Sequence, residues 1–156
     1  MNDKIKLLIL DVDGTLTDGG VYVNEDGSEF RKFNAKDGMG IKRARQLGFE
    51  VGIISHSHLP GLIGHRAKVL GIPWVYAGNE PKLAILDGWL QKNGWHLDQV
   101  AFIGDDINDL ELIDRVGLSA CPQDAVDEVK NQVDHVLTRH GGDGAVREFI
   151  DRFLIP

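Results

Sequence analysis

Short apolar runs alternate with longer amphipathic stretches along most of this chain. The apolar runs have the length of buried strands and cover 5–10, 51–54, 74–76, 100–103, a stretch near Leu118 and 136–137. Apolar residues at helical spacing predict helices over 37–47, over a stretch that ends at Leu70, from Pro81 to Leu90, over 110–115 and over 145–154. Strands that alternate with helices over short connections predict parallel pairing with right-handed crossovers.

One segment departs from this alternation. Val21–Val23 and Glu29–Phe33 flank Asn24-Glu25-Asp26-Gly27, where the glycine can adopt positive φ, so this segment predicts a β-hairpin. We therefore expect an α/β fold with a Rossmann-like parallel sheet, helices on both of its faces and a hairpin flap at 18–33. No repeat or linker divides the sequence, so 1–156 is expected to form one domain.

Composition and charge narrow the classes of function. The 156 residues include 17 Lys and Arg against 24 Asp and Glu, and the net charge of −7 argues against nucleic-acid and anionic-membrane partners. The single cysteine, Cys121, excludes an internal disulfide and a Cys-rich zinc site. No stretch resembles a secretory signal or a membrane span, so we expect a soluble cytoplasmic protein. On charge alone, an anionic substrate would also be unexpected.

The position of the acidic residues changes that expectation. Polar residues follow three of the predicted strands: Asp11-Val12-Asp13-Gly14-Thr15, Ser55-His56-Ser57-His58 and Gly104-Asp105-Asp106-Ile107-Asn108-Asp109. In an open parallel sheet, ligands bind beyond the carboxyl ends of the strands. Clustered carboxylates are unfavourable unless a cation neutralises them, and an oxygen-only set suits Mg²⁺. Any one aspartate could simply cap the following helix, but that explanation is weak for three strand ends at once.

Lys82 is unusual for its position. It follows Asn79-Glu80-Pro81 and so falls in the first turn of a predicted helix, where a cation opposes the helix dipole. A lysine beside free backbone N–H groups could bind a phosphate. An exposed lysine at a small energetic cost is the alternative.

These residues carry a resemblance. Asp11-x-Asp13-Gly14-Thr15, Ser55, Lys82 and Gly104-Asp105-Asp106-x-Asn108-Asp109 resemble, in order, the four motifs of the haloacid dehalogenase superfamily of phosphohydrolases. The resemblance implies that Asp11 attacks phosphorus and that Asp13 acts as general acid and base. It implies that Ser55 and Lys82 hold the phosphoryl oxygens. Mg²⁺ would be bound by Asp11, Asp105 and the backbone carbonyl of Asp13, with its surroundings oriented by Asp106, Asn108 and Asp109.

The length of the chain points to one branch of this superfamily. It leaves no room for a cap domain beyond the hairpin, as in the branch of 3-deoxy-D-manno-octulosonate 8-phosphate and nonulosonate 9-phosphate phosphatases. In that branch the hairpins pair between subunits of a homotetramer and neighbouring subunits cover each site. The resemblance also implies a set of substrate contacts: Asn34, Ala35, Lys36, Asp37, Gly38, Lys42, His56, Arg66 and Lys82. Asp37 could instead cap the next helix, and Lys42 and Arg66 could be solvated cations.

One departure from the branch keeps alternatives open. His56-Ser57 stands where octulosonate phosphatases usually have Gly-Arg and nonulosonate phosphatases Gly-Glu. The sequence thus predicts a phosphatase for a phosphorylated 2-keto-3-deoxy sugar acid, with octulosonate 8-phosphate first and a nonulosonate 9-phosphate second. A receiver-like phospho-acceptor module and a non-catalytic oligomerisation module are the non-enzyme alternatives.

Overall fold

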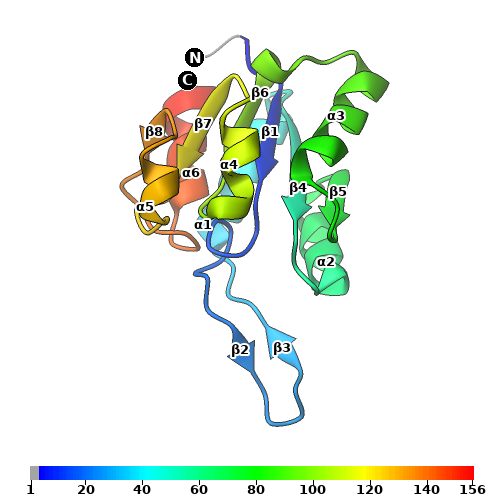
Figure 1. Ribbon diagram of the computed structural model, residues 1–156, viewed down its shortest axis with the longest axis vertical. Coiled ribbons are helices and arrows are strands. Elements are labelled where there is room, and N and C mark those ends of the chain that lie inside the picture. Colours follow the sequence, from blue (N-terminus) through cyan, green and yellow to red (C-terminus); the bar gives the residue numbers. More distant parts are fainter. Residues whose placement is uncertain (1–3) are drawn as a thin grey trace.

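A parallel sheet forms the centre of the computed structural model, which describes residues 4–156 (Figure 1). Its strand order is β5-β4-β1-β6-β7-β8, and every pairing is parallel. The strands are β1 (Leu7–Leu10), β4 (Glu50–Ser55), β5 (Trp74–Ala77), β6 (Val100–Ile103), β7 (Leu118–Cys121) and β8 (His135–Val136). β8 is one residue earlier than its apolar pair predicts.

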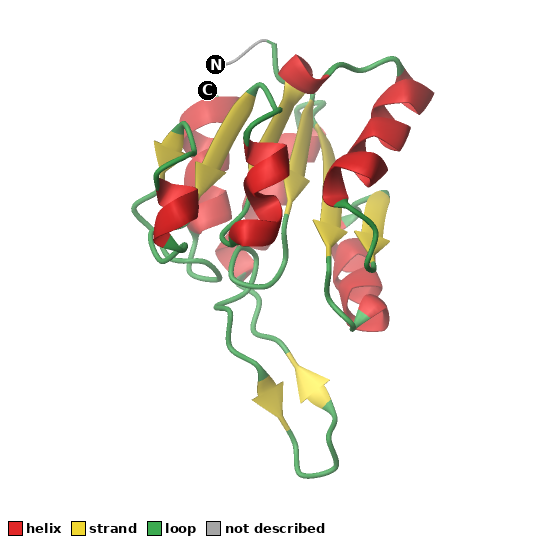
Figure 2. Ribbon diagram, in the orientation of Figure 1, coloured by secondary structure: helices red, strands yellow, loops and turns green. Residues whose placement is uncertain are grey.

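Helices cover both faces of the sheet (Figure 2). They are α1 (Ala35–Gln46), α2 (Pro60–Leu70), α3 (Lys82–Asn93), α4 (Leu110–Ile113), α5 (Asp127–Lys130) and α6 (Ala145–Phe149). Short 3-10 turns span Leu97–Gln99 and Ile107–Asp109, and the predicted last helix continues past α6 as a π-helical turn at Ile150–Leu154. Among the residues that the structure describes, no helix is both long and apolar enough to cross a membrane.

Alternation along the strands assigns the two apolar layers. In β1, Leu8 and Leu10 pack with the apolar residues of α1, α2 and α6, whereas Leu7 and Ile9 pack with those of α3, α4 and α5. Successive side chains of a strand point to opposite faces, so a fully apolar strand is buried from both sides. The predicted α/β fold with a doubly covered parallel sheet is confirmed.

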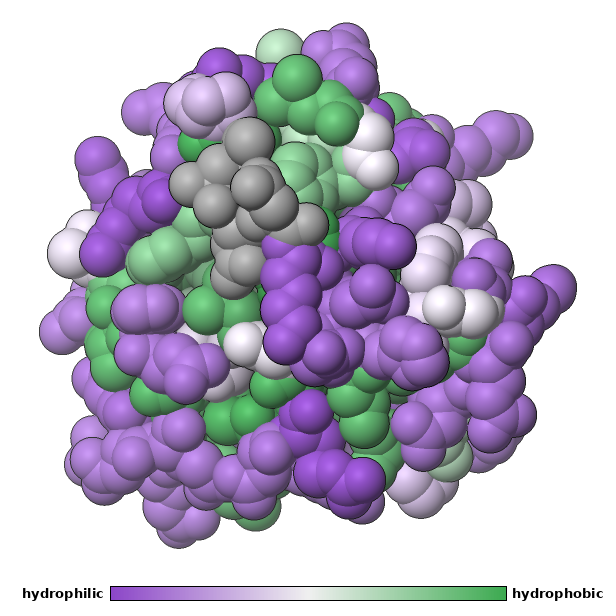
Figure 3. All heavy atoms as spheres, turned by 90° about the horizontal axis from the view of Figure 1, so that it is seen from above, coloured by the Kyte–Doolittle hydropathy of each residue, from purple (hydrophilic) through white to green (hydrophobic). Residues whose placement is uncertain are grey.

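The predicted hairpin is present and projects away from the body. β2 (Tyr22–Val23) and β3 (Glu29–Phe30) pair antiparallel, and Gly27 has a φ of +83° in the turn between them. The pairing is shorter than predicted, because beyond Phe30 the chain returns to the body and Phe33 bridges to Thr17. The hairpin leaves the edge of the sheet at which the strands end (Figure 1). The opposite end, at the strands' beginnings, presents mostly polar side chains (Figure 3).

Candidate active site

The order of the strands brings three motifs together. β1 lies between β4 and β6, and the carboxyl ends of these three strands carry Asp11, Ser55 and Asp105. The chain passes from β1 to one side of the sheet and later to the other, which makes this the switch point at which open α/β sheets bind ligands. A cavity of about 340 Å³ opens here. It is lined by Asp11, Asp13, Gly19, Val21, Arg31, Ser55, His56, Ser57, His58, Asp105, Asp106 and Asn108.

Lys82 lies beneath this cavity, between two carboxylates. Its Nζ is 2.7 Å from Oδ1 of Asp11 and 2.7 Å from Oδ1 of Asp109, and its side chain is only 2 % exposed. Burial alone would lower the pKa of Lys82, but the charges of the two aspartates outweigh it and raise that pKa. The lysine at the start of α3 is therefore a charged, buried partner of the β1 aspartate rather than a solvated cation.

Asp109 is fully buried, and protein donors occupy both of its oxygens. Oδ1 binds Lys82, while Oδ2 accepts from the backbone N–H groups of Asp105 (2.9 Å) and Asp106 (3.3 Å). Gly104 makes this possible, because a Cβ there would lie 2.5 Å from the carboxyl carbon of Asp109. This arrangement favours an orienting role for Asp109, which holds both Lys82 and the loop after β6.

Three carboxylates converge below the ends of β1 and β6. One oxygen each of Asp11, Asp105 and Asp109 lies within 4.8 Å of the others. Burial, followed by the charge of Asp11, raises the pKa of Asp105 to about 9 and that of Asp109 to about 6. Without a cation the site thus favours protonated carboxyls. An oxygen-only donor set of this kind fits a hard divalent ion, and Asp11 and Asp105 are the carboxylates best placed to hold it.

Asp13 occupies a different environment from Asp11. Its side chain is 42 % exposed at the cavity, and its Oδ1 forms an ion pair with Nε of Arg31 at 3.0 Å. Thr17 holds the loop that leads from Asp13 to the hairpin. Its Oγ1 accepts from the N–H groups of Gly14 (3.1 Å) and Gly19 (3.3 Å). One aspartate is therefore enclosed beside Lys82 and the other can exchange protons with a ligand or water.

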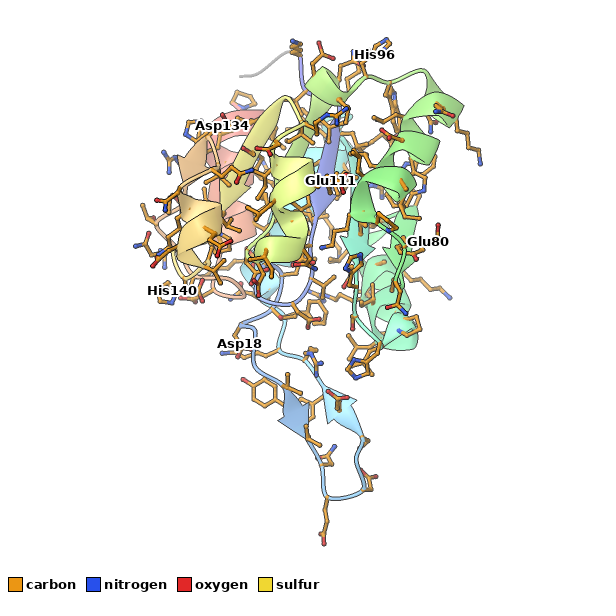
Figure 4. The ribbon with its side chains drawn as sticks, viewed as in Figure 1. Asp18, Glu80, His96, Glu111, Asp134 and His140 are labelled. Atoms are coloured by element: carbon orange, nitrogen blue, oxygen red, sulfur yellow. The ribbon has the colours of Figure 1, made fainter. Side chains whose placement is uncertain are left out.

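His56 ties together three loops around the cavity. Its Nε2 lies 2.9 Å from the carbonyl oxygen of Glu80, and because a carbonyl only accepts, this nitrogen carries the hydrogen. Nδ1 faces the amide of Asn108 at 3.5 Å. Glu80 is labelled in Figure 4 in the loop that precedes α3, the helix that carries Lys82. Ser55 is buried beside His56, and its Oγ accepts from the N–H of Ser57 at 3.1 Å.

Several residues expected to contact substrate do not reach this cavity. Asn34 caps α1, its side chain accepting from the N–H of Lys36 at 2.8 Å. Lys36 lines a separate cavity of about 310 Å³ beside α6, and Lys42 lines a third. Ala35 is an exposed residue of α1. None of the four lines the cavity at the strand ends, and their expected contacts with substrate stay predictions.

Asp37 is not the helix cap that its position allows. Its carboxylate is 1 % exposed and accepts from the N–H of Arg147 in α6 at 2.8 Å, while Oδ2 has no partner. Burial raises the pKa of Asp37 against the lowering effect of that hydrogen bond. Asp37 thus joins α1 to α6 and does not cap its own helix, and its expected contact with substrate stays a prediction.

Arg66 is packed rather than solvated. Its guanidinium carbon lies 5.2 Å from the ring centroid of Phe33, and its Nε is buried without a hydrogen-bond partner. A Cβ on Gly38 would come within 3.0 Å of Nη2 of Arg66, so this glycine leaves room for the arginine. The expected contact between Arg66 and a substrate carboxylate stays a prediction.

Sequence reasoning missed Arg31 and Glu29, and it did not give His58 its partner. Arg31 binds both Asp13 and Glu29, and Nε2 of His58 binds Glu29 at 2.6 Å. A signal was available, because Glu29 and Arg31 carry opposite charges two residues apart in the predicted strand 29–33, which places them on the same face. No local sequence pattern, however, identifies Asp13 as the second partner of Arg31.

Comparison with known proteins supports the chemistry of the cavity. Residues 74–150 match the family model for haloacid dehalogenase-like hydrolases. The chain is 39% identical over 153 residues to the 3-deoxy-D-manno-octulosonate 8-phosphate phosphatase KdsC of Escherichia coli K12, a match that covers 98% of this chain and 81% of that protein. The chain belongs to the haloacid dehalogenase-like hydrolase family. Its class is that of the phosphoric monoester hydrolases, so a receiver module or a non-catalytic module is not supported.

Solved structures agree with this membership. The octulosonate phosphatase of Yersinia pestis superposes with a TM-score of 0.91 at 38% identity, covering 95% of this chain and 80% of that one. The corresponding enzyme of Moraxella catarrhalis, solved with a magnesium ion, a phosphate ion and a KDO molecule, has a TM-score of 0.91 at 35% identity and covers 95% and 84%. The predicted capless fold of the octulosonate phosphatase branch is confirmed.

Proposed function

We propose that this chain is a Mg²⁺-dependent phosphatase that hydrolyses 3-deoxy-D-manno-octulosonate 8-phosphate. The observation that carries the proposal is the arrangement of Asp11, held by Lys82 at 2.7 Å beside Asp105, with Asp13 at the exposed side of the same cavity. The 39% identity to the Escherichia coli enzyme and the ligands of the Moraxella catarrhalis enzyme support this choice of substrate and cation.

In the first chemical step, a carboxylate oxygen of Asp11 forms a bond to phosphorus. The bond between phosphorus and the sugar oxygen breaks, and Asp13 gives its proton to that departing oxygen. The products of this step are the free sugar acid, an aspartyl-phosphate on Asp11 and an ionised Asp13. The contact with Lys82 holds the Asp11 carboxylate in place at the end of β1.

In the second step, a water molecule attacks the aspartyl-phosphate. Asp13 takes a proton from this water, the bond between Asp11 and phosphorus breaks, and inorganic phosphate leaves. Asp13 is then protonated again for the next cycle. The partial exposure of its side chain allows this exchange with water.

The remaining residues stabilise charge on the transferring group. Ser55 Oγ and Lys82 Nζ are the donors available to the phosphoryl oxygens at the strand ends. Mg²⁺ would be held by the carboxylates of Asp11 and Asp105 and the backbone carbonyl of Asp13, and would supply the positive charge that lets a phosphate dianion enter an acidic site. Asp106, Asn108 and Asp109 lie around Asp105 and orient its loop.

A hydrolysis panel tests the proposal. We expect Mg²⁺-dependent release of phosphate from octulosonate 8-phosphate, with a kcat/KM well above that for nonulosonate 9-phosphates and simple hexose phosphates. Asp11→Asn should abolish turnover of every ester in the panel because its amide is a poor nucleophile. Preference for a nonulosonate 9-phosphate would correct the substrate, and robust turnover by Asp11→Asn would overturn the mechanism.

We further propose that the enzyme is a cytoplasmic homotetramer in which the hairpins pair between subunits. Val21, Val23 and Phe30 are 62%, 61% and 50% exposed on the projecting hairpin, whose short strands have open edges. Light scattering should give the mass of four chains, and Val23→Lys should lower that mass.

The proposed compartment rests on Cys121. It is a buried free thiol, which suits a reducing compartment.

A further inference from the structure

A series of four side chains, His58, Glu29, Arg31 and Asp13, connects the hairpin to the candidate acid and base. Nε2 of His58 binds Oε2 of Glu29 at 2.6 Å, and Oε1 of Glu29 accepts from Nη2 of Arg31 at 3.1 Å. Nε of Arg31 then binds Oδ1 of Asp13 at 3.0 Å. The series runs from the loop after β4, across the base of the hairpin, to the loop after β1.

Arg31 is the buried member of this series. Its side chain is 4% exposed, and its Nη1 donates to the carbonyl oxygen of Phe30 at 3.1 Å. All three guanidinium nitrogens therefore have an acceptor within the protein. A buried guanidinium with every nitrogen bound is held in one orientation, because releasing any contact leaves part of its charge desolvated without a partner.

Asp13, in contrast, has little else to fix its carboxylate. It precedes Gly14, whose φ is +82°, and its side chain is 42% exposed. Arg31 is the one side chain with a hydrogen bond or ion pair to the Asp13 carboxylate among the contacts of residues 4–156. Because Nε of Arg31 binds Oδ1, this contact fixes the orientation of the Asp13 carboxylate and leaves Oδ2 facing away from the bond.

We propose that Arg31 is a positioning residue, which holds the Asp13 carboxylate in the orientation from which it protonates the departing oxygen. The inference rests on the proposed function, because it concerns the acid of that reaction. It gives the hairpin a second role besides assembly: Glu29, itself bound by His58, holds Nη2 of Arg31 while Nε binds Asp13.

The test measures how much the reaction depends on the acidity of the leaving group. Purified enzyme with Mg²⁺ is assayed on a series of aryl phosphates, from p-nitrophenyl phosphate to phenyl phosphates with more basic phenols. The value of kcat/KM reports the step in which the phenol leaves. In an enzyme with a well-placed acid, kcat/KM falls only slightly as the departing phenol becomes more basic. In Asp13→Asn, kcat/KM should fall steeply along the same series.

We expect Arg31→Gln to resemble Asp13→Asn. It should lower kcat/KM about tenfold or more for the most basic phenol but less than about threefold for p-nitrophenyl phosphate. Arg31→Lys should recover part of the lost activity, because an ammonium can reach one of the two carboxylates. Lys32→Gln is the matched control: it removes the same charge from the next, exposed residue and should leave the whole series unchanged.

Two results would overturn the inference. One is an equal loss by Arg31→Gln along the whole series, which indicates a role in folding or binding; the other is no loss at all. Circular dichroism and thermal melting identify a variant that has not folded, and Arg31→Lys then carries the test. If Asp13→Asn itself shows a shallow series, the role of Asp13 in the proposed function fails, which is a different outcome from failure of Arg31→Gln alone.

Discussion

Lys82 provides the most quantitative test of how the site is built. Its Nζ lies 2.7 Å from both Asp11 and Asp109, and neither it nor Asp109 has more than 2% of its side chain exposed. Lys82→Met keeps most of the apolar stem and removes the ammonium. The buried carboxylate of Asp109 then loses its cation while two backbone N–H groups still bind its other oxygen.

The expected cost follows from burial rather than from the number of contacts. Removing one partner of a buried ion pair typically costs about 3–5 kcal/mol because an uncompensated charge remains. The two N–H donors to Asp109 offset part of this, so we expect Lys82→Met to lower the free energy of unfolding by about 3 kcal/mol. Adding Asp109→Asn neutralises the more deeply buried of the two carboxylates that lose their cation and should restore much of the loss. The coupling between the two substitutions should therefore be about 2–3 kcal/mol.

Urea unfolding at pH 7.5 in EDTA, at one fixed protein concentration, measures all four proteins of this cycle. The matched control is the cycle of Lys4→Met and Asp98→Asn, whose charged atoms are 2.9 Å apart but whose side chains are 61% and 56% exposed. Its coupling should be close to zero, because water and salt screen an exposed pair. Equal couplings in the two cycles would refute the argument that burial makes the Lys82 pair strong.

Two further predictions concern residues around the site. Gly14→Ala and Gly27→Ala each place a side chain at a φ of +82° or +83°, which costs about 1–2 kcal/mol, but only at Gly14 would the new Cβ overlap the Asp105 carboxylate. In thermal melting, Gly14→Ala should therefore lose more stability than Gly27→Ala. In phosphatase assays, Gly14→Ala should lose activity and Gly27→Ala should keep it. Equal effects of the two substitutions would contradict this. Burial raises the pKa of Asp37 in the folded state, so this carboxyl contributes less stability as pH rises through its unfolded value of about 4. In urea unfolding, the free energy of unfolding of Asp37→Asn relative to that of wild type should therefore rise between pH 4 and pH 7. Its KM should equal that of wild type, and a raised KM would support Asp37 as a substrate contact.

The sequence was a good guide to the elements and to the residues at strand ends. The apolar run that ends at Asp11 and the one that ends at Gly104 both become central strands, because a strand buried on two faces must be apolar throughout. Their parallel pairing carries Asp11 and Asp105 to the same edge. Lys82 could be suspected from its position alone, since a cation in the first turn of a helix needs a reason.

What the sequence could not supply were the partners of these side chains. Lys82 meets Asp11 across 71 residues of sequence, and Asp37 turns to Arg147 across 110. Arg31 reaches Asp13 because the hairpin folds back against the loop after β1. The patterns that define a strand or helix act over a few residues, through backbone hydrogen bonds and the burial of one face, and so they are readable in sequence order. Which charged side chains are buried together depends on how strands are ordered and how helices and the hairpin dock on them, and that was decided only by the tertiary structure.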